Sequence, residues 1–211
     1  MPFSAILFDL DGTLIDSPKL WREAYRGGLK DIGHTLQEKD FARLYPSGKP
    51  MRDWLMELGI DQSHYATLRT SRDRMYEDLL RNEVVWHDGA EACFKTIAKK
   101  YPTGIVTGSH KTYIDAIEHR IPLRSLVNVL LDETDLEGKS KPRPDGLLRA
   151  AEQLNVDPKQ CLYIGDQPFD ALAAQNAGME CWIVKRPFAP EKFPVQPQKI
   201  FEVLEEALKF L

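Results

Sequence analysis

Five short runs of apolar residues recur along the chain, and within each run the apolar residues follow one another almost without interruption. They are Ser4–Leu10, Thr103–Gly108, Asn128–Asp132, Cys161–Asp166 and Glu180–Lys185. A strand with one face in water alternates polar and apolar residues, whereas continuous apolar runs indicate parallel strands that are covered on both faces. Parallel strands need long crossover connections, because a tight turn cannot join them. The pattern therefore predicts a central sheet with helices on both sides.

Segments with helical periodicity lie between these runs. They are Gly89–Lys100, Lys111–His119, Pro144–Leu154 and Pro168–Ala177, with a last helix near Lys199–Leu211. The alternation of strands and helices is typical of a doubly wound, Rossmann-like α/β fold with a parallel sheet. The loop Arg186–Gln198 holds four prolines, and we expect it to cross the surface before the last helix.

Residues 16–85 break this alternation, and we call them the insertion. They contain no convincing strand, and their apolar residues recur at helical spacings: Trp21/Tyr25/Leu29, Phe41/Leu44, Trp54/Leu55/Leu58 and Leu68/Met75/Leu79. We interpret these stripes as the interior of a small helical bundle. Because the insertion follows the first strand, we expect it above the carboxyl end of the sheet, where ligands bind in open α/β folds. The predicted domains are an α/β core of residues 1–15 and 86–211 and a helical cap of residues 16–85.

Composition excludes several classes of partner. The net charge of −4 gives no basic footprint for nucleic acid or an anionic membrane. No run approaches the ~20 apolar residues of a membrane span. The three cysteines are odd in number and lack paired metal-type spacing, so we expect buried thiols in a reducing compartment. We expect a cytoplasmic protein that is a monomer or a small homo-oligomer.

The first predicted strand ends in two carboxylates, Asp9 and Asp11. Alternate side chains of an extended chain share a face, so both point the same way and repel each other. A cation or a shared proton relieves such repulsion. The alternative is a simple turn, because Asp-Gly is a common turn pair.

Other strand ends carry groups that suit a phosphate. Thr107 and Gly108 end the second run, where a hydroxyl and an open backbone can bind an oxyanion, although Thr-Gly-Ser is also common turn chemistry. Lys141 precedes a proline and is either a fixed cation or part of a solvated basic loop.

The fourth run ends at Asp166, beside a glycine and well placed for a hard cation, and Asp170 follows near a helix start. Asp170 alone is equally consistent with a charge that interacts with the helix dipole. Oxygen ligands select a hard cation, so the whole set fits a phosphate-transfer site with one Mg²⁺.

In these residues the chain resembles the haloacid dehalogenase-like hydrolase superfamily, in its phosphoglycolate phosphatase and β-phosphoglucomutase-like branch. Four motifs occur in the family's order: Asp-Leu-Asp-Gly-Thr-Leu (9–14), Ile-Val-Thr-Gly-Ser (105–109), Lys-Pro-Arg-Pro-Asp (141–145) and Gly-Asp-Gln-Pro-Phe-Asp (165–170). The insertion resembles the family's helical cap. The resemblance covers nearly the whole chain.

The resemblance implies a role for each of these residues. Asp9 is the expected nucleophile, which forms an aspartyl-phosphate, and Asp11 is the expected general acid and base. The carboxylates of Asp9 and Asp166 and the backbone carbonyl of Asp11 are the expected Mg²⁺ ligands. Thr107, Gly108 and Lys141 are expected to hold the phosphoryl group, where positioning and electrostatics carry the catalysis. Asp170 is expected to orient Lys141 or a metal-bound water.

The cap is expected to set specificity, since it contributes residues over the leaving group. Lys49 and Arg52 lie where a loop enters a helix, and we predict that they contact the substrate. Solvent-exposed charges without such a role are the alternative.

The function predicted from these residues is the Mg²⁺-dependent hydrolysis of a small phosphorylated metabolite. A phosphosugar mutase uses the same acyl-phosphate and stays open as an alternative. A catalytically silent binding protein on this fold is the other alternative, but its mark would be a lost motif residue, and none is lost.

Overall fold

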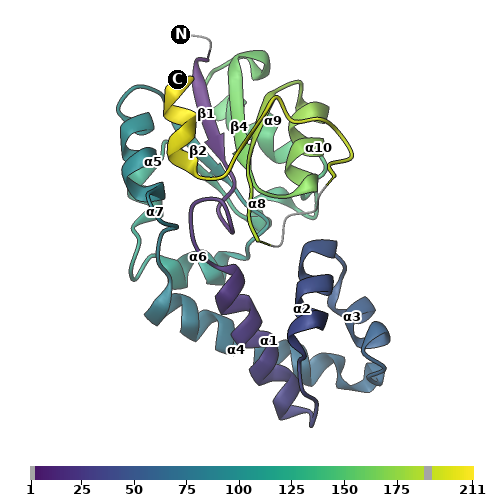
Figure 1. The fold of residues 1–211 in the computed structure, drawn as a ribbon. Coiled ribbons are helices and arrows are strands. Elements are labelled where there is room, and N and C mark those ends of the chain that lie inside the picture. Colours follow the sequence, from purple (N-terminus) through teal and green to yellow (C-terminus); the bar gives the residue numbers. More distant parts are fainter. Residues whose placement is uncertain (1–2, 188–191) are drawn as a thin grey trace.

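The computed structural model describes residues 3–187 and 192–211, which contain a six-stranded parallel sheet in the order β3-β2-β1-β4-β5-β6 (Figure 1). The strands are β1 (Ala5–Phe8), β2 (Thr103–Val106), β3 (Val129–Leu131), β4 (Cys161–Gly165), β5 (Glu180–Val184) and β6 (Lys199–Phe201). The chain moves outward from β1 through β2 to β3 and then returns to place β4 on the other side of β1. The order therefore reverses between β1 and β4, which is the switch point of a doubly wound sheet. Each of the five predicted runs contains a strand.

Helices cover both faces of the sheet, and successive residues of β1 pack against opposite helical layers. Ile6 and Phe8 pack on one face with α5 (Ala90–Ala98) and α6 (Lys111–Ile117). Ala5 and Leu7 pack on the other face with α9 (Asp145–Gln153) and α10 (Pro168–Ala177). The helices predicted between the strands are thus confirmed. Short helices α7 (Leu123–Leu126), α8 (Glu133–Leu136) and η3 (Pro158–Gln160) complete the connections.

The predicted helix at Lys199–Leu211 is wrong. Lys199–Phe201 form β6, which pairs with β5, and only Leu204–Lys209 turn into a 3₁₀ helix, η4. Phe201, Leu204 and Ala207 are buried at a spacing that also fits a helix, so the sequence pattern alone favoured one. Residues 199–201 form a strand instead, because the edge of β5 offers backbone hydrogen bonds to them. The proline-rich loop predicted before it falls partly on residues 188–191, which lie outside the described residues.

The insertion folds into helices that lie beyond the carboxyl ends of the strands (Figure 1). They are α1 (Pro18–Asp31), α2 (Glu38–Leu44), α3 (Met51–Glu57) and α4 (Tyr65–Glu83), with 3₁₀ turns η1 (Tyr45–Ser47) and η2 (Gln62–His64). Their apolar side chains form a separate small core, in which the rings of Tyr25 and Trp54 stack 4.3 Å apart. Met75 and Leu79 instead pack against the core of the α/β domain. α4 therefore belongs to both cores. The sequence pattern predicted Met75 and Leu79 in the interior of the insertion alone.

Two chain segments connect the insertion to the sheet, and they run side by side. The N–H of Asp16 donates to the carbonyl of Val85 (3.0 Å), and the N–H of His87 donates to the carbonyl of Leu14 (2.9 Å). Ile15 and Trp86 form an antiparallel bridge between them. These contacts support our proposed limits of 16–85 for the cap.

In the described part of the chain, no helix combines the length and the apolar composition that crossing a membrane requires. Cys93, Cys161 and Cys181 are all buried and free.

The edge strand β6 provides a test of the fold. Phe201 is 7% exposed and packs edge-on against Trp182, with ring centroids 5.5 Å apart. We expect Phe201→Ala to lower the free energy of unfolding by about 3 kcal/mol in urea denaturation, through lost burial and a cavity. The neighbouring Ile200 is 46% exposed, so Ile200→Ala is the control and should change it by less than about 1 kcal/mol. Equal effects of the two substitutions would contradict the placement of β6.

Candidate active site

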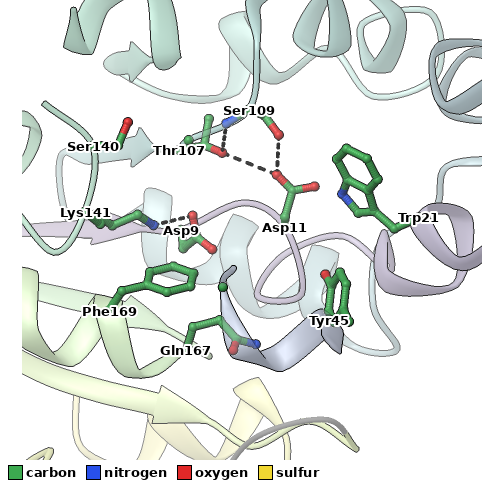
Figure 2. A pocket seen from close by; sticks show the side chains of 12 residues that line it. Asp9, Asp11, Trp21, Tyr45, Thr107, Ser109, Ser140, Lys141, Gln167 and Phe169 are labelled. Carbon is green, nitrogen blue, oxygen red and sulfur yellow. Dashed lines mark hydrogen bonds and ion pairs between the residues drawn. The ribbon is translucent and has the colours of Figure 1, made fainter. Parts of the chain in front are cut away.

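The sheet brings the predicted site residues to one edge, at the reversal of strand order. Asp9 follows β1, Thr107 follows β2 and Asp166 follows β4. β1 lies between β2 and β4, so these three side chains emerge from adjacent strands. Figure 2 shows Asp9, Asp11, Thr107 and Lys141 around one pocket.

Lys141 is the buried cation of the site. Its Nζ donates to Oδ1 of Asp9 (2.7 Å), Oδ1 of Asp170 (2.7 Å) and the hydroxyl of Tyr163 (2.8 Å). Its side chain is only 5% exposed. Burial on its own lowers the pKa of Lys141, but the carboxylates of Asp170 and Asp9 more than offset this and raise it above its usual range. The ammonium group is therefore charged. Tyr163 was not predicted, because an apolar strand gives no sign of which side chain reaches a distant lysine.

Three buried carboxylates gather beside this ammonium group, from Asp9, Asp166 and Asp170. One oxygen of each lies within 4.8 Å of the others. Burial raises the pKa of Asp9 well above its usual range, against the lowering effect of Lys141. Burial, and next the charge of Asp170, raise the pKa of Asp166 to about 7. One ammonium group cannot neutralise this cluster, and a hard divalent cation with oxygen ligands would relieve the repulsion. The donor set thus fits the predicted Mg²⁺.

Asp170 uses both of its carboxylate oxygens within the protein. Oδ1 accepts from Lys141 and from the Tyr163 hydroxyl (3.1 Å), and Oδ2 accepts from the N–H groups of Asp166 (3.1 Å) and Gln167 (2.9 Å). Asp170 therefore fixes the position of Lys141 and ties the end of β4 to the start of α10. This geometry agrees with its predicted orienting role.

Asp166 is held close to the loop that follows β1. Its Oδ1 accepts from the hydroxyl of Thr13 (3.1 Å), and its Oδ2 accepts from the side-chain amide of Gln167. Gly12 packs against the same carboxylate: a Cβ there would lie 2.6 Å from Oδ2. Gly12 also has a φ of +78°, so both space and backbone conformation require glycine.

Asp11 lies in a different environment from Asp9. Its Oδ2 accepts from the hydroxyls of Ser109 (2.6 Å) and Thr107 (3.3 Å) (Figure 2). Its Oδ1 accepts from the hydroxyl of Tyr76 (3.2 Å). The side chain of Asp11 is not part of the cluster of three carboxylates, and the Mg²⁺ contact predicted for it concerned its backbone carbonyl. Tyr76 lies on α4, so the insertion reaches the carboxylate directly. Ser109 stands in the second motif, but nothing in the pattern pointed to Tyr76.

A pocket of about 340 Å³ opens over these carboxylates. Core and insertion both line it, with Asp9, Asp11, Trp21, Tyr45, Gly48, Thr107, Gly108, Ser109, Ser140, Lys141, Gln167 and Phe169. Gly108 lines the pocket, and its contact with a phosphoryl group stays a prediction. The segment predicted to supply Lys49 and Arg52 does reach the pocket, but through Tyr45 and Gly48.

Lys49 and Arg52 themselves have other partners. The ammonium group of Lys49 pairs with Glu57, and the guanidinium of Arg52 lies 4.0 Å above the ring of Tyr65. Neither side chain lines the pocket. Their contact with substrate stays a prediction.

Comparison with known proteins agrees with this geometry. The family model described as haloacid dehalogenase-like hydrolase matches residues 6–184. The chain belongs to this family. It is 32% identical over 194 residues to (DL)-glycerol-3-phosphatase 2 of Arabidopsis thaliana, covering 86% of this chain and 79% of that protein. It is 25% identical over 196 residues to the phosphoglycolate phosphatase of Shigella boydii, covering 82% and 77%.

Solved structures share the fold. A conserved haloacid dehalogenase-like protein of unknown function from Agrobacterium tumefaciens superposes with a TM-score of 0.84, at 20% identity, over 99% of this chain and 97% of that one. The family model and the curated relatives confirm the predicted family and its phosphoglycolate phosphatase-like branch, and the solved structure confirms the Rossmann-like fold class.

The raised pKa of Asp166 has a consequence for stability. Between pH about 4 and 7 the folded protein keeps a proton that the unfolded chain has released, so without divalent cations its stability falls as the pH rises through this window. We expect Asp166→Asn to be more stable than the wild-type protein by about 1–3 kcal/mol at pH 8 in EDTA, and by a clearly smaller margin at pH 5. Urea denaturation at both pH values measures this.

Mg²⁺ supplies the matched condition for the same experiment. It should stabilise the wild-type protein at pH 8 and stabilise Asp166→Asn much less, since a ligand that binds only the folded state shifts unfolding by mass action. A variant that is less stable than wild type at pH 8 in EDTA would contradict the interpretation of Asp166 as an unfavourable buried charge.

Proposed function

We propose that this haloacid dehalogenase-like phosphatase hydrolyses a small phosphorylated metabolite through an aspartyl-phosphate on Asp9. The observation that carries the proposal is the contact of Lys141 with both Asp9 and Asp170 at the floor of the pocket. This contact fixes one oxygen of the Asp9 carboxylate. The carboxylate still lines the pocket, where a phosphoryl group can approach it.

In the first step, an oxygen of Asp9 forms a bond to phosphorus while the bond from phosphorus to the ester oxygen breaks. Asp11 donates a proton to the departing oxygen. In the second step, water attacks the phosphorus of the aspartyl-phosphate, Asp11 accepts a proton from that water, and phosphate leaves with Asp9 regenerated. The hydroxyl contacts of Asp11 hold it at the side of the pocket toward the insertion, where the alcohol would depart.

The remaining residues bind the transferring group. Lys141 neutralises charge on the phosphoryl oxygens, and the Thr107 hydroxyl and the backbone at Gly108 donate hydrogen bonds to them. The carboxylates of Asp9 and Asp166 and the backbone carbonyl of Asp11 would hold Mg²⁺, which when bound neutralises the negative charge of the site and of the phosphate. Asp170 keeps Lys141 in place.

We place this activity in the cytoplasm, in a monomer or small homo-oligomer. The two curated relatives are named for substrates whose leaving groups differ in charge, glycerol in one and glycolate in the other. The family resemblance therefore leaves the alcohol open.

Asp9→Asn tests the nucleophile. We expect it to lower Mg²⁺-dependent phosphate release from a panel of phosphorylated metabolites by at least ~10³-fold, because an amide cannot form the acyl-phosphate. Asp115→Asn, on the exposed surface of α6, removes an equivalent charge away from the pocket and should leave release unchanged. EDTA should abolish release in all three proteins.

Two outcomes would change the proposal. Equal release by Asp9→Asn and wild type would remove Asp9 as the nucleophile. Interconversion of hexose phosphate isomers with little free phosphate would identify a phosphosugar mutase instead.

A further inference from the structure

The insertion covers the pocket with uncharged groups. It contributes the indole of Trp21 from α1, the phenol of Tyr45 from η1 and the backbone of Gly48. Figure 2 shows Trp21 beside Asp11 and Tyr45 below it, on the side of the pocket away from Lys141. Burial, and next the carboxylates of Asp166, Asp11 and Asp9, raise the pKa of Tyr45 well above its usual range, in agreement with a neutral phenol close to these acids.

The ring of Trp21 is held in place by packing on the side away from the pocket. It stacks on that of Tyr76 at 3.8 Å and 20°, and the guanidinium of Arg72 lies 4.7 Å from its centroid. Arg72 itself donates to the hydroxyl of Tyr25 and pairs with Asp73. It is committed to the interior of the insertion and does not line the pocket.

Positive charge is scarce where the leaving group would lie. Among the described residues that line the pocket, Lys141 is the only cation, and it is engaged by Asp9 and Asp170. Lys49 is paired with Glu57, and Arg52 stacks on Tyr65. A second anionic group on the substrate would therefore enter beside Asp11 with no cation to meet it. Burying an unpaired charge costs several kcal/mol, whereas burying a hydroxyl costs much less when it finds a hydrogen bond.

We propose, resting on the phosphatase function above, that the substrate is a phosphate monoester of an uncharged alcohol. The class is a polyol or sugar phosphate, and monoesters whose leaving group carries a carboxylate or a second phosphate are poor substrates. The rings of Trp21 and Tyr45 contact the carbon skeleton of the alcohol. Trp21 and Ser140 also line the pocket, and the indole N–H and the hydroxyl that they carry can bond the hydroxyl groups of the alcohol. Trp21 and Tyr45 are thus specificity-determining residues.

Matched substrate pairs test this selectivity. Glycerol 3-phosphate and 3-phosphoglycerate differ chiefly in a hydroxymethyl group against a carboxylate, as do 2-hydroxyethyl phosphate and 2-phosphoglycolate. With the Mg²⁺-loaded enzyme, we expect kcat/KM to be at least ~10-fold higher for the uncharged member of each pair. Equal or faster hydrolysis of the acids would overturn the proposal.

A parallel assay separates this proposal from the phosphatase function. Hydrolysis of p-nitrophenyl phosphate needs the catalytic residues but no particular alcohol. If it is hydrolysed and the acids are preferred, only the selectivity is wrong. If neither it nor any of the four esters is hydrolysed, the proposed function itself fails.

A charge introduced at Gly48 provides the reciprocal test. An added Cβ at Gly48 would meet no atom within 4 Å, and the φ of +63° strains any replacement equally. We compare Gly48→Lys with Gly48→Gln, which has a side chain of similar reach and no charge. For each substrate pair we take the ratio of kcat/KM for the acid to kcat/KM for its uncharged partner. This ratio should be at least about 5-fold higher in Gly48→Lys than in Gly48→Gln. The same ratio in both variants would contradict a selectivity set by the missing cation.

Discussion

The ammonium group of Lys141 is the interaction on which the rest of the site depends. It is buried among three groups from distant parts of the chain: Asp9 after β1, Tyr163 on β4 and Asp170 on α10. Two of these groups are carboxylates, and it contacts both. Without it, Asp9 and Asp170 would be unpaired buried charges, which a fold tolerates poorly. With it the cluster still has excess negative charge, because one ammonium group faces three carboxylates. The site therefore carries a local electrostatic cost that a divalent cation, if bound there as we propose, would offset.

The fold gives two identical carboxylates two environments, which is the physical basis of the two roles that we propose for them. Asp9 is 4% exposed and bonded to a lysine, whereas Asp11, two residues later, accepts hydrogen bonds from three hydroxyl groups. One of these hydroxyls belongs to Tyr76 in the insertion. Tyr76 also supports Trp21, so a single side chain links the proposed acid to the wall of the leaving-group pocket. If Asp11 is the acid and Trp21 contacts the alcohol, as we propose, Tyr76 connects the two functions physically.

The sequence predicted what depends on strand ends and missed what depends on contacts between distant helices. Asp9, Thr107 and Asp166 were accessible to prediction because parallel strands bring their carboxyl ends to one edge. Trp21 was predicted as part of the interior of the insertion, and nothing in a helical stripe shows that one of its members also faces a pocket. Tyr76 was not singled out by the sequence at all. Lys49 and Arg52 were chosen for their charge, but Glu57 and Tyr65, invisible as partners in the sequence, engage them. The strand β6 was missed because its apolar spacing also fits a helix and only pairing with β5 decides.

The two connections between sheet and insertion enter and leave at neighbouring points, tied by hydrogen bonds from Asp16 to Val85 and from His87 to Leu14. A segment whose ends nearly coincide can be lengthened, shortened or exchanged without moving the strands on either side. In the proposed function, the part that selects the alcohol is thus separable from the part that reacts with phosphate. Changes within residues 16–85 could then alter the substrate while the proposed phosphate-binding residues stay in place, and Tyr76 is the contact with Asp11 that such changes would keep or lose.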